Sequence, residues 1–298
     1  MQTARLGGSD LEVSRVGLGC NNFGWRLDSA ATRSVVDTAL EAGITFLDTA
    51  DIYGELGDSE RFLGEALAGR RDRVVLATKF GNDMRGLNGD GPPGSREYMR
   101  RAIDASLERL RTDSVDLYYY HRPDGVTPIA ETVGAMRELV DEGKVRWLGL
   151  SNVDAAQIRE AADVAEIVAV QNHYSLMRRD DDAEVLPVCR ELGIGYIPFF
   201  PLESGLLTGK YRRGEPAPEG ARLSGSTDRL TDERLGRVEE LEALAARDGH
   251  TLLELAIGGL ASIPGVASVI AGATSPEQAR ANAAAGSWEL TAAELAEI

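Results

Sequence analysis

The chain has little cysteine and no long apolar run. Only two cysteines, Cys20 and Cys189, occur in 298 residues; they lie far apart and fit no metal-ligand spacing. We therefore expect free thiols in a reducing compartment. No apolar run approaches the roughly 18 residues that a membrane helix needs, and the N-terminal segment lacks the apolar core of a signal peptide. These absences predict a cytoplasmic protein without a membrane partner.

Basic residues are also scarce relative to acidic ones. Lys and Arg number 32 against 48 Asp and Glu, which gives a formal net charge of −16. Such a field repels nucleic acid, so we expect no nucleic-acid partner. It leaves room for a small anionic ligand, because a phosphate needs only a local pocket of amides and one or two cations. The acidic run at 180–182 is typical of a helix N-terminal turn, and we predict no metal site.

Apolar runs typical of buried strands alternate with amphipathic helical patterns. The expected strands span 16–19, 44–47, 74–78, 115–120, 145–150, 167–170, 194–199 and 267–271. Helices are expected to begin after residues that can cap a helix N-terminus, namely Ser29, Ser59, Ser95, Thr127, Asp154, Asp180, Thr231, Thr251 and Ser275. Strands alternating with helices predict an α/β fold with a parallel sheet, and eight of them favour a closed (β/α)8 TIM barrel. No linker interrupts the pattern, so we expect a single domain over 1–298.

Three segments depart from this rhythm. Residues 4–13, ARLGGSDLEV, predict an N-terminal β-hairpin that closes the bottom of the barrel. A Gly/Pro-rich loop at 81–95 and a longer loop at 202–232 follow the third and seventh strands. Both loops leave the C-terminal face, where barrel enzymes build their sites, so they are candidate covers for a substrate or cofactor. The alternative is a disordered excursion on the surface.

Four polar side chains lie at or just after successive strand ends. Lys79 ends one strand, and burying its ammonium group in the barrel mouth would be unfavourable unless a carboxylate, here Asp48, pairs with it. Tyr53 follows five residues after Asp48, and a nearby ammonium would lower the phenol pKa from its usual value near 10. His121 ends the fourth strand and can hydrogen-bond a carbonyl oxygen. Each residue alone has a structural alternative, such as a rim ion pair, but together they favour an acid that protonates a carbonyl group.

At this point the chain resembles the aldo-keto reductase family over nearly its whole length. The family's catalytic tetrad of Asp, Tyr, Lys and His maps onto Asp48, Tyr53, Lys79 and His121. The similar segments, in the expected order, are GITFLDTADIYG, LATKF, LYYYHRPD, GKVRWLGLSN, VQNHYS, GLLTGKY and GATSPEQARAN. The resemblance implies a TIM barrel and a nicotinamide cofactor bound in extended form without a Rossmann fold.

The resemblance also implies three sets of cofactor contacts. Ser151, Asn152 and Gln171 would bind the carboxamide, and Phe199 would stack on the nicotinamide ring in place of the family's usual Tyr. The pyrophosphate would lie against Leu202, Ser204, Gly205, Leu207 and Lys210. The adenosine end would lie among Gly272, Thr274, Gln278 and Asn282.

The adenosine block lacks the cation that NADP-preferring relatives commonly place there. Gly272, Thr274 and Gln278 are uncharged, and a 2′-phosphate is recognised by charge-assisted contacts. Arg280, or Arg212 and Arg213 in the long loop, could substitute. We favour NADPH on the resemblance and keep NADH open.

The sequence thus predicts an NAD(P)H-dependent enzyme that reduces an aldehyde or ketone, a sugar among the candidates, with Tyr53 as proton donor. Phe23, Trp25 and Met84 are expected to line the substrate pocket. One alternative is an aldolase that forms a Schiff base on Lys79. Another is a cofactor-binding barrel that senses redox state with little turnover. The physiological substrate and the oligomeric state are left open by the sequence.

Overall fold

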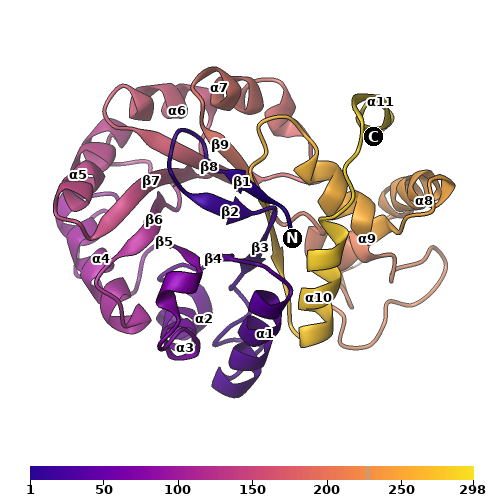
Figure 1. The fold of residues 1–298 in the computed structure, drawn as a ribbon, viewed down its shortest axis with the longest axis horizontal. Coiled ribbons are helices and arrows are strands. Elements are labelled where there is room, and N and C mark those ends of the chain that lie inside the picture. Colours follow the sequence, from indigo (N-terminus) through magenta and orange to yellow (C-terminus); the bar gives the residue numbers. More distant parts are fainter. Residues whose placement is uncertain (227) are drawn as a thin grey trace.

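Eight parallel strands close into a barrel in the computed structural model, which describes residues 1–226 and 228–298 (Figure 1). Around the barrel the order is β10-β3-β4-β5-β6-β7-β8-β9. The strands are β3 (Val16–Gly19), β4 (Phe46–Asp48), β5 (Val75–Phe80), β6 (Val115–Tyr120), β7 (Val145–Ser151), β8 (Ile167–His173), β9 (Gly195–Phe199) and β10 (Val269–Gly272). Each expected strand overlaps one of these, and the predicted TIM barrel is confirmed.

Helices surround the barrel in Figure 1. They are α1 (Ser29–Glu41), α2 (Tyr53–Leu56), α3 (Asp58–Ala66), α4 (Arg96–Leu110), α5 (Ile129–Asp141), α6 (Ala155–Ala162), α7 (Val185–Glu191), α8 (Asp232–Arg247), α9 (Leu252–Glu254), α10 (Pro276–Ala285) and α11 (Ala292–Leu295). A π-helical turn, Leu255–Gly259, continues α9. The 3-10 turns are Arg71–Arg73, Asp180–Asp182 and Glu203–Thr208.

Five expected caps are observed, each accepting a hydrogen bond from a first-turn N–H: Ser95, Asp154, Thr231, Thr251 and Ser275. The other four expectations are displaced. The hydroxyls of Ser29, Ser59 and Thr127 are occupied by Glu65, the Cys20 carbonyl and Asp124. Asp28, Gly57 and Pro128 take the N-cap positions instead. Asp180 opens a 3-10 turn, and α7 begins only at Val185.

The barrel interior is filled by large and small side chains from its strands. Side chains on a strand point alternately to its two faces, so every second residue points inward. The inner cluster includes Phe46, Ala77, Leu117, Tyr119, Ala169, Ile197 and Ile270. Gly149 of β7 faces this cluster, because a Cβ there would lie 2.5 Å from the Tyr119 ring. The absence of a side chain at Gly149 leaves the room that Tyr119 fills.

The predicted hairpin is confirmed and lies across the N-terminal end of the barrel. Strands β1 (Thr3–Arg5) and β2 (Glu12–Ser14) pair antiparallel, and Figure 1 shows them within the ring of barrel strands. Leu6, Leu11 and Val13 are buried and belong to the same cluster as the inward-facing barrel residues. The hairpin therefore supplies the bottom layer of the interior.

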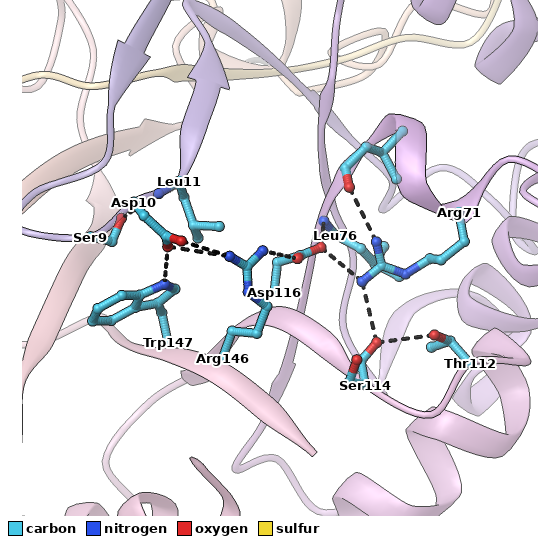
Figure 2. A network of polar contacts seen from close by, with 11 residues as sticks. Ser9, Asp10, Leu11, Arg71, Leu76, Thr112, Ser114, Asp116, Arg146 and Trp147 are labelled. Carbon is cyan, nitrogen blue, oxygen red and sulfur yellow. Dashed lines mark hydrogen bonds and ion pairs between the residues drawn. The ribbon is translucent and has the colours of Figure 1, made fainter. Parts of the chain in front are cut away.

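Polar contacts fasten the hairpin turn to three barrel strands (Figure 2). Asp10 in the turn accepts hydrogen bonds from the side chains of Arg146 and Trp147 on β7. Arg146 also donates to Asp116 on β6 at 2.9 Å. The same Asp116 carboxylate accepts from the Leu76 N–H on β5 and from Arg71. The network links the turn to β5, β6 and β7, on the side away from the strand ends that carry the predicted site.

We predict that Gly149→Ala destabilises the protein by about 1–3 kcal/mol, because the new methyl group overpacks against the Tyr119 ring. Urea denaturation followed by circular dichroism measures the change. Gly134→Ala on α5 is the matched control, since its Cβ would meet only Val164 Cγ1 at 3.8 Å and alanine favours a helix. Equal stability of Gly149→Ala and wild type would show that Tyr119 does not need this space.

Candidate active site

The last interior layer at the C-terminal end of the barrel is polar. Moving two residues along each strand from the apolar layer keeps the side chain on the inner face. Phe46, Ala77 and Ala169 are followed in this way by Asp48, Lys79 and Gln171, all of which are buried. Tyr119 is followed by His121. The strand period that builds the core thus brings three of the four predicted catalytic side chains to one end of the barrel.

Lys79 and Asp48 form a fully buried ion pair. Lys79 Nζ donates to Asp48 Oδ2 at 2.6 Å and to the Thr49 carbonyl at 2.9 Å. Gln171 Nε2 donates to the other Asp48 oxygen at 3.0 Å. Burial alone would lower the Lys79 pKa, but Asp48 and Tyr53 outweigh it and raise the pKa above its usual value. Lys79 is therefore an ammonium at neutral pH.

Tyr53 lies beside this pair at the start of α2. The Lys79 ammonium is 5.2 Å from the centre of the Tyr53 ring, and the His121 ring packs edge-on against it with centroids 5.7 Å apart. Burial raises the Tyr53 pKa, and Lys79 offsets only part of this effect. The expected lowering of this pKa is therefore wrong for the free protein, because desolvation of the phenolate outweighs the ammonium. Tyr53 keeps its proton at neutral pH.

His121 is neutral and held in one orientation. Burial lowers its pKa well below the usual value, and the positive charges of Lys79 and Arg122 lower it further. The Asn82 side-chain amide lies 2.9 Å from His121 Nδ1. If the amide nitrogen donates, Nδ1 is the acceptor, and the ring proton is on Nε2. Sequence reasoning missed Asn82, which lies in the loop after β5.

These residues open onto a cavity of about 630 Å³, a size typical of small-molecule and cofactor sites. Asp48, Tyr53 and His121 line it, whereas Lys79 and Ser151 are buried behind the surface. Eleven of the thirteen residues expected to contact a cofactor also line it: Asn152, Gln171, Phe199, Leu202, Ser204, Gly205, Lys210, Gly272, Thr274, Gln278 and Asn282. The cavity thus runs from the strand ends to the start of α10.

Several expected contacts need correction. Phe23 and Met84 are completely buried, and Leu207 is a buried residue of the 3-10 turn Glu203–Thr208, so these three side chains do not line the cavity. Trp25 is 58% exposed and is likewise not part of the lining. The long loop after β9 contributes to the cavity, but the described lining includes no residue of the loop at 81–95. Thr227, in the first of these loops, lies outside the described residues.

Four cations line the cavity: Arg26, Arg122, Lys210 and Arg222. Within residues 1–226 and 228–298, none of them forms an ion pair with a carboxylate. Burial lowers the pKa of Lys210, and so do the nearby charges of Arg222 and Arg26. Arg222 also donates to Asn22 at 2.9 Å, which joins the long loop to the loop after β3.

None of the cations considered for the adenosine block belongs to the cavity lining of the described residues. Arg212 and Arg213 pair with Glu242 and Glu239 on α8, and Arg280 is exposed outside the cavity lining. Sequence reasoning missed Arg26 and Arg222, because neither belongs to a strand or to a block that resembles the family.

Comparison with known proteins decides the family. The model of the Aldo/keto reductase family matches residues 15–298. The chain belongs to the aldo/keto reductase family. It is 39% identical over 266 residues to a probable aldo-keto reductase 1 from Glycine max, covering 86% of this chain and 76% of the relative. Members of this family are oxidoreductases, which is the general class of enzyme that the sequence predicts for this chain.

Two solved aldo-keto reductase structures share the fold along almost the full chain. An aldo-keto reductase from Bacillus halodurans, in its holo form, is 35% identical with a TM-score of 0.84 and covers 100% of this chain and 95% of its own. A glycerol dehydrogenase from Gluconobacter oxydans is 29% identical with a TM-score of 0.86, covering 98% and 92%. In the described part of this chain, no helix is long and apolar enough to cross a membrane. The same residues contain no group of three or more His, Cys, Asp or Glu side chains placed to hold a metal ion.

We predict that Asp48→Asn and Lys79→Met each destabilise the protein by about 3–5 kcal/mol, because each leaves a buried charge without its partner. The double variant should cost clearly less than the sum of the two, since it leaves no unpaired charge. Guanidinium denaturation of the wild type, the two single variants and the double variant gives the free energies of unfolding for this double-mutant cycle. Additive effects would mean that the two side chains do not stabilise one another.

Proposed function

We propose that this protein reduces an aldehyde or ketone to the alcohol with NAD(P)H. The observation that carries the proposal is the convergence of Tyr53, His121 and the Lys79–Asp48 pair at one end of a cavity of cofactor size. The two structural neighbours, one a holo form and one a glycerol dehydrogenase, support the same reaction class.

Tyr53 is the proposed acid. It keeps its proton at neutral pH, so it can donate that proton to a carbonyl oxygen that gains negative charge. The Lys79 ammonium lies near the ring and stabilises the phenolate as it forms. Asp48 holds Lys79 charged and in place. Lys79 therefore contributes when charge develops, rather than by ionising the tyrosine beforehand.

His121 is the proposed group that orients the substrate. Its ring is neutral, and an Nε2–H would donate to the carbonyl oxygen next to Tyr53 without competing as an acid. Asn152 donates to the His121 carbonyl at 2.8 Å, which ties β7 to this strand end. Tyr53 and His121 would together hold the carbonyl oxygen of the substrate by two hydrogen bonds and leave the carbonyl carbon facing the cavity.

The cavity fits a nicotinamide dinucleotide in chemistry as well as in size. The Asn152 and Gln171 amides and the Phe199 ring line it, and so do Arg26, Lys210 and Arg222, which form no ion pair within the described residues. A nicotinamide bound there would supply the hydride. Arg26, Lys210 and Arg222 repel one another, and bound phosphates would relieve this repulsion. We propose NADPH as the preferred cofactor, with NADH as the alternative.

The Schiff-base alternative loses support from the geometry of Lys79. A nucleophilic lysine must be neutral and reachable. Here the side chain is 0% exposed and paired at 2.6 Å with Asp48, and its pKa is raised.

Tyr53→Phe should lower kcat by about 10²–10⁴-fold, the usual contribution of a positioned acid, and leave the Kd for NADPH within a factor of about two. Absorbance at 340 nm follows turnover on glyceraldehyde and nitrobenzaldehyde, and quenching of protein fluorescence follows binding. Tyr118→Phe is the matched control, because the buried Tyr118 hydroxyl has no hydrogen-bond partner in the structure as described. Full activity of Tyr53→Phe would remove the proton-donor assignment. Cofactor binding without turnover in wild type would favour the redox-sensing alternative.

Arg222→Gln should weaken NADPH binding about tenfold or more, because it removes a charge-assisted contact to phosphate. Arg212→Gln is the matched control, since Arg212 belongs to the same long loop but pairs with Glu242. Isothermal titration calorimetry with NADPH and with NADH distinguishes a contact of Arg222 with the pyrophosphate from a contact with the 2′-phosphate. An equal loss for both cofactors assigns Arg222 to the pyrophosphate, and a loss for NADPH alone assigns it to the 2′-phosphate. Unchanged affinity for both would exclude Arg222 from the cofactor site.

A further inference from the structure

Arg122 lies at the end of the cavity that holds Tyr53 and His121, and it forms no ion pair within residues 1–226 and 228–298. It follows His121 directly in the chain, is exposed and lines the cavity. In the part of the chain that the structure describes, no carboxylate lies within ion-pair distance of it. The acidic residue closest in sequence, Asp124, is occupied: it accepts hydrogen bonds from the backbone of Gly94, Val126 and Thr127. The Arg122 guanidinium is therefore available to a ligand.

This cation is distinct from the three attributed to cofactor phosphates. Arg26, Lys210 and Arg222 act on one another, as the lowered pKa of Lys210 shows. Arg122 instead acts on His121, whose pKa it helps to lower. Charge interactions weaken with distance, so Arg122 lies at the end where the carbonyl reacts. A cofactor held by the first three cations leaves this one unused.

We infer that the natural substrate carries a carboxylate or phosphate group, and that Arg122 binds this group while the carbonyl oxygen contacts Tyr53 and His121. The inference rests on the proposed reductase function. A guanidinium presents paired N–H donors that match either anion. The anionic group takes no part in the chemistry: the carbonyl carbon gains the hydride, and the oxygen gains the Tyr53 proton.

The charge of the whole protein strengthens this inference. At a net charge of −16, the surface as a whole repels an anionic substrate. Arg122, which has no ion-pair partner among the described residues, offers a local positive charge at the mouth against that field. Arg122 and His121 are also consecutive residues, with Cα atoms about 3.8 Å apart. Both side chains therefore start from the same strand end, which is why short aldehydes serve as the test substrates.

Two matched substrate pairs test the inference. Succinic semialdehyde is compared with butanal for a carboxylate, and glyceraldehyde 3-phosphate with glyceraldehyde for a phosphate. We expect the anionic member of at least one pair to have a kcat/KM at least tenfold higher in wild type, mainly through a lower KM. The pair that shows the preference identifies the anion. The preference should shrink as ionic strength rises.

Three variants separate a contact from a general effect of charge. Arg122→Gln should remove the preference and leave kcat/KM for the neutral substrates within about twofold. Arg122→Lys should restore part of it, because the charge returns without the paired donors. Arg280→Gln is the matched control: Arg280 is exposed on α10 outside the cavity lining, and its loss changes the net charge equally. It should leave the preference intact.

The outcomes are distinguishable from failure of the proposed function. Turnover of the neutral aldehydes without any preference for either anion would overturn the role of Arg122 and leave the reductase function standing. An equal loss for charged and neutral substrates in Arg122→Gln would also overturn it. No turnover of any of the four carbonyl compounds would overturn the reductase function, and this inference with it.

Discussion

The arrangement at the barrel mouth depends on keeping one ammonium group charged in a buried place. Lys79 is stable there only because Asp48 and the Thr49 carbonyl surround its nitrogen. Gln171 completes the Asp48 carboxylate from across the barrel. Tyr119 brings its ring to within 5.6 Å of the same ammonium, and it fits because Gly149 has no side chain. The packing of the barrel interior therefore helps to determine the surroundings of the Lys79 ammonium at the barrel mouth.

The cavity and the rest of the surface carry opposite electrostatic character. The chain has a net charge of −16, yet the one carboxylate that lines the cavity in the described residues, Asp48, is neutralised by Lys79. Four cations line the same space without acidic partners there. The net negative charge of the protein repels large polyanions, whereas the cations that line the cavity determine which small anions can bind there.

Regular structure made much of this predictable from sequence. Strand period and the ends of apolar runs located Asp48, Lys79 and His121, because inward direction follows from counting by two. Loop residues have no such period, which is why Phe23 and Met84 were misplaced and why Arg26 and Arg222 were missed. The pKa direction of Tyr53 was also wrong, since it depends on burial, which a spacing of residues does not contain. Ser29 and Ser59 failed as caps because distant partners occupy their hydroxyls.

The N-terminal end of the barrel holds the strands in register, whereas the loops that line the cavity leave from the C-terminal end. Asp10, Arg146 and Asp116 hold the hairpin and three strands together far from the chemistry. Strand register is thereby secured at one end, while the loops that receive ligands leave from the other. Those loops can therefore change in length or charge without loosening the scaffold beneath them. Arg122, directly after the proposed orienting residue His121, lies on that upper side of the barrel, where a change of one side chain leaves the strand register untouched.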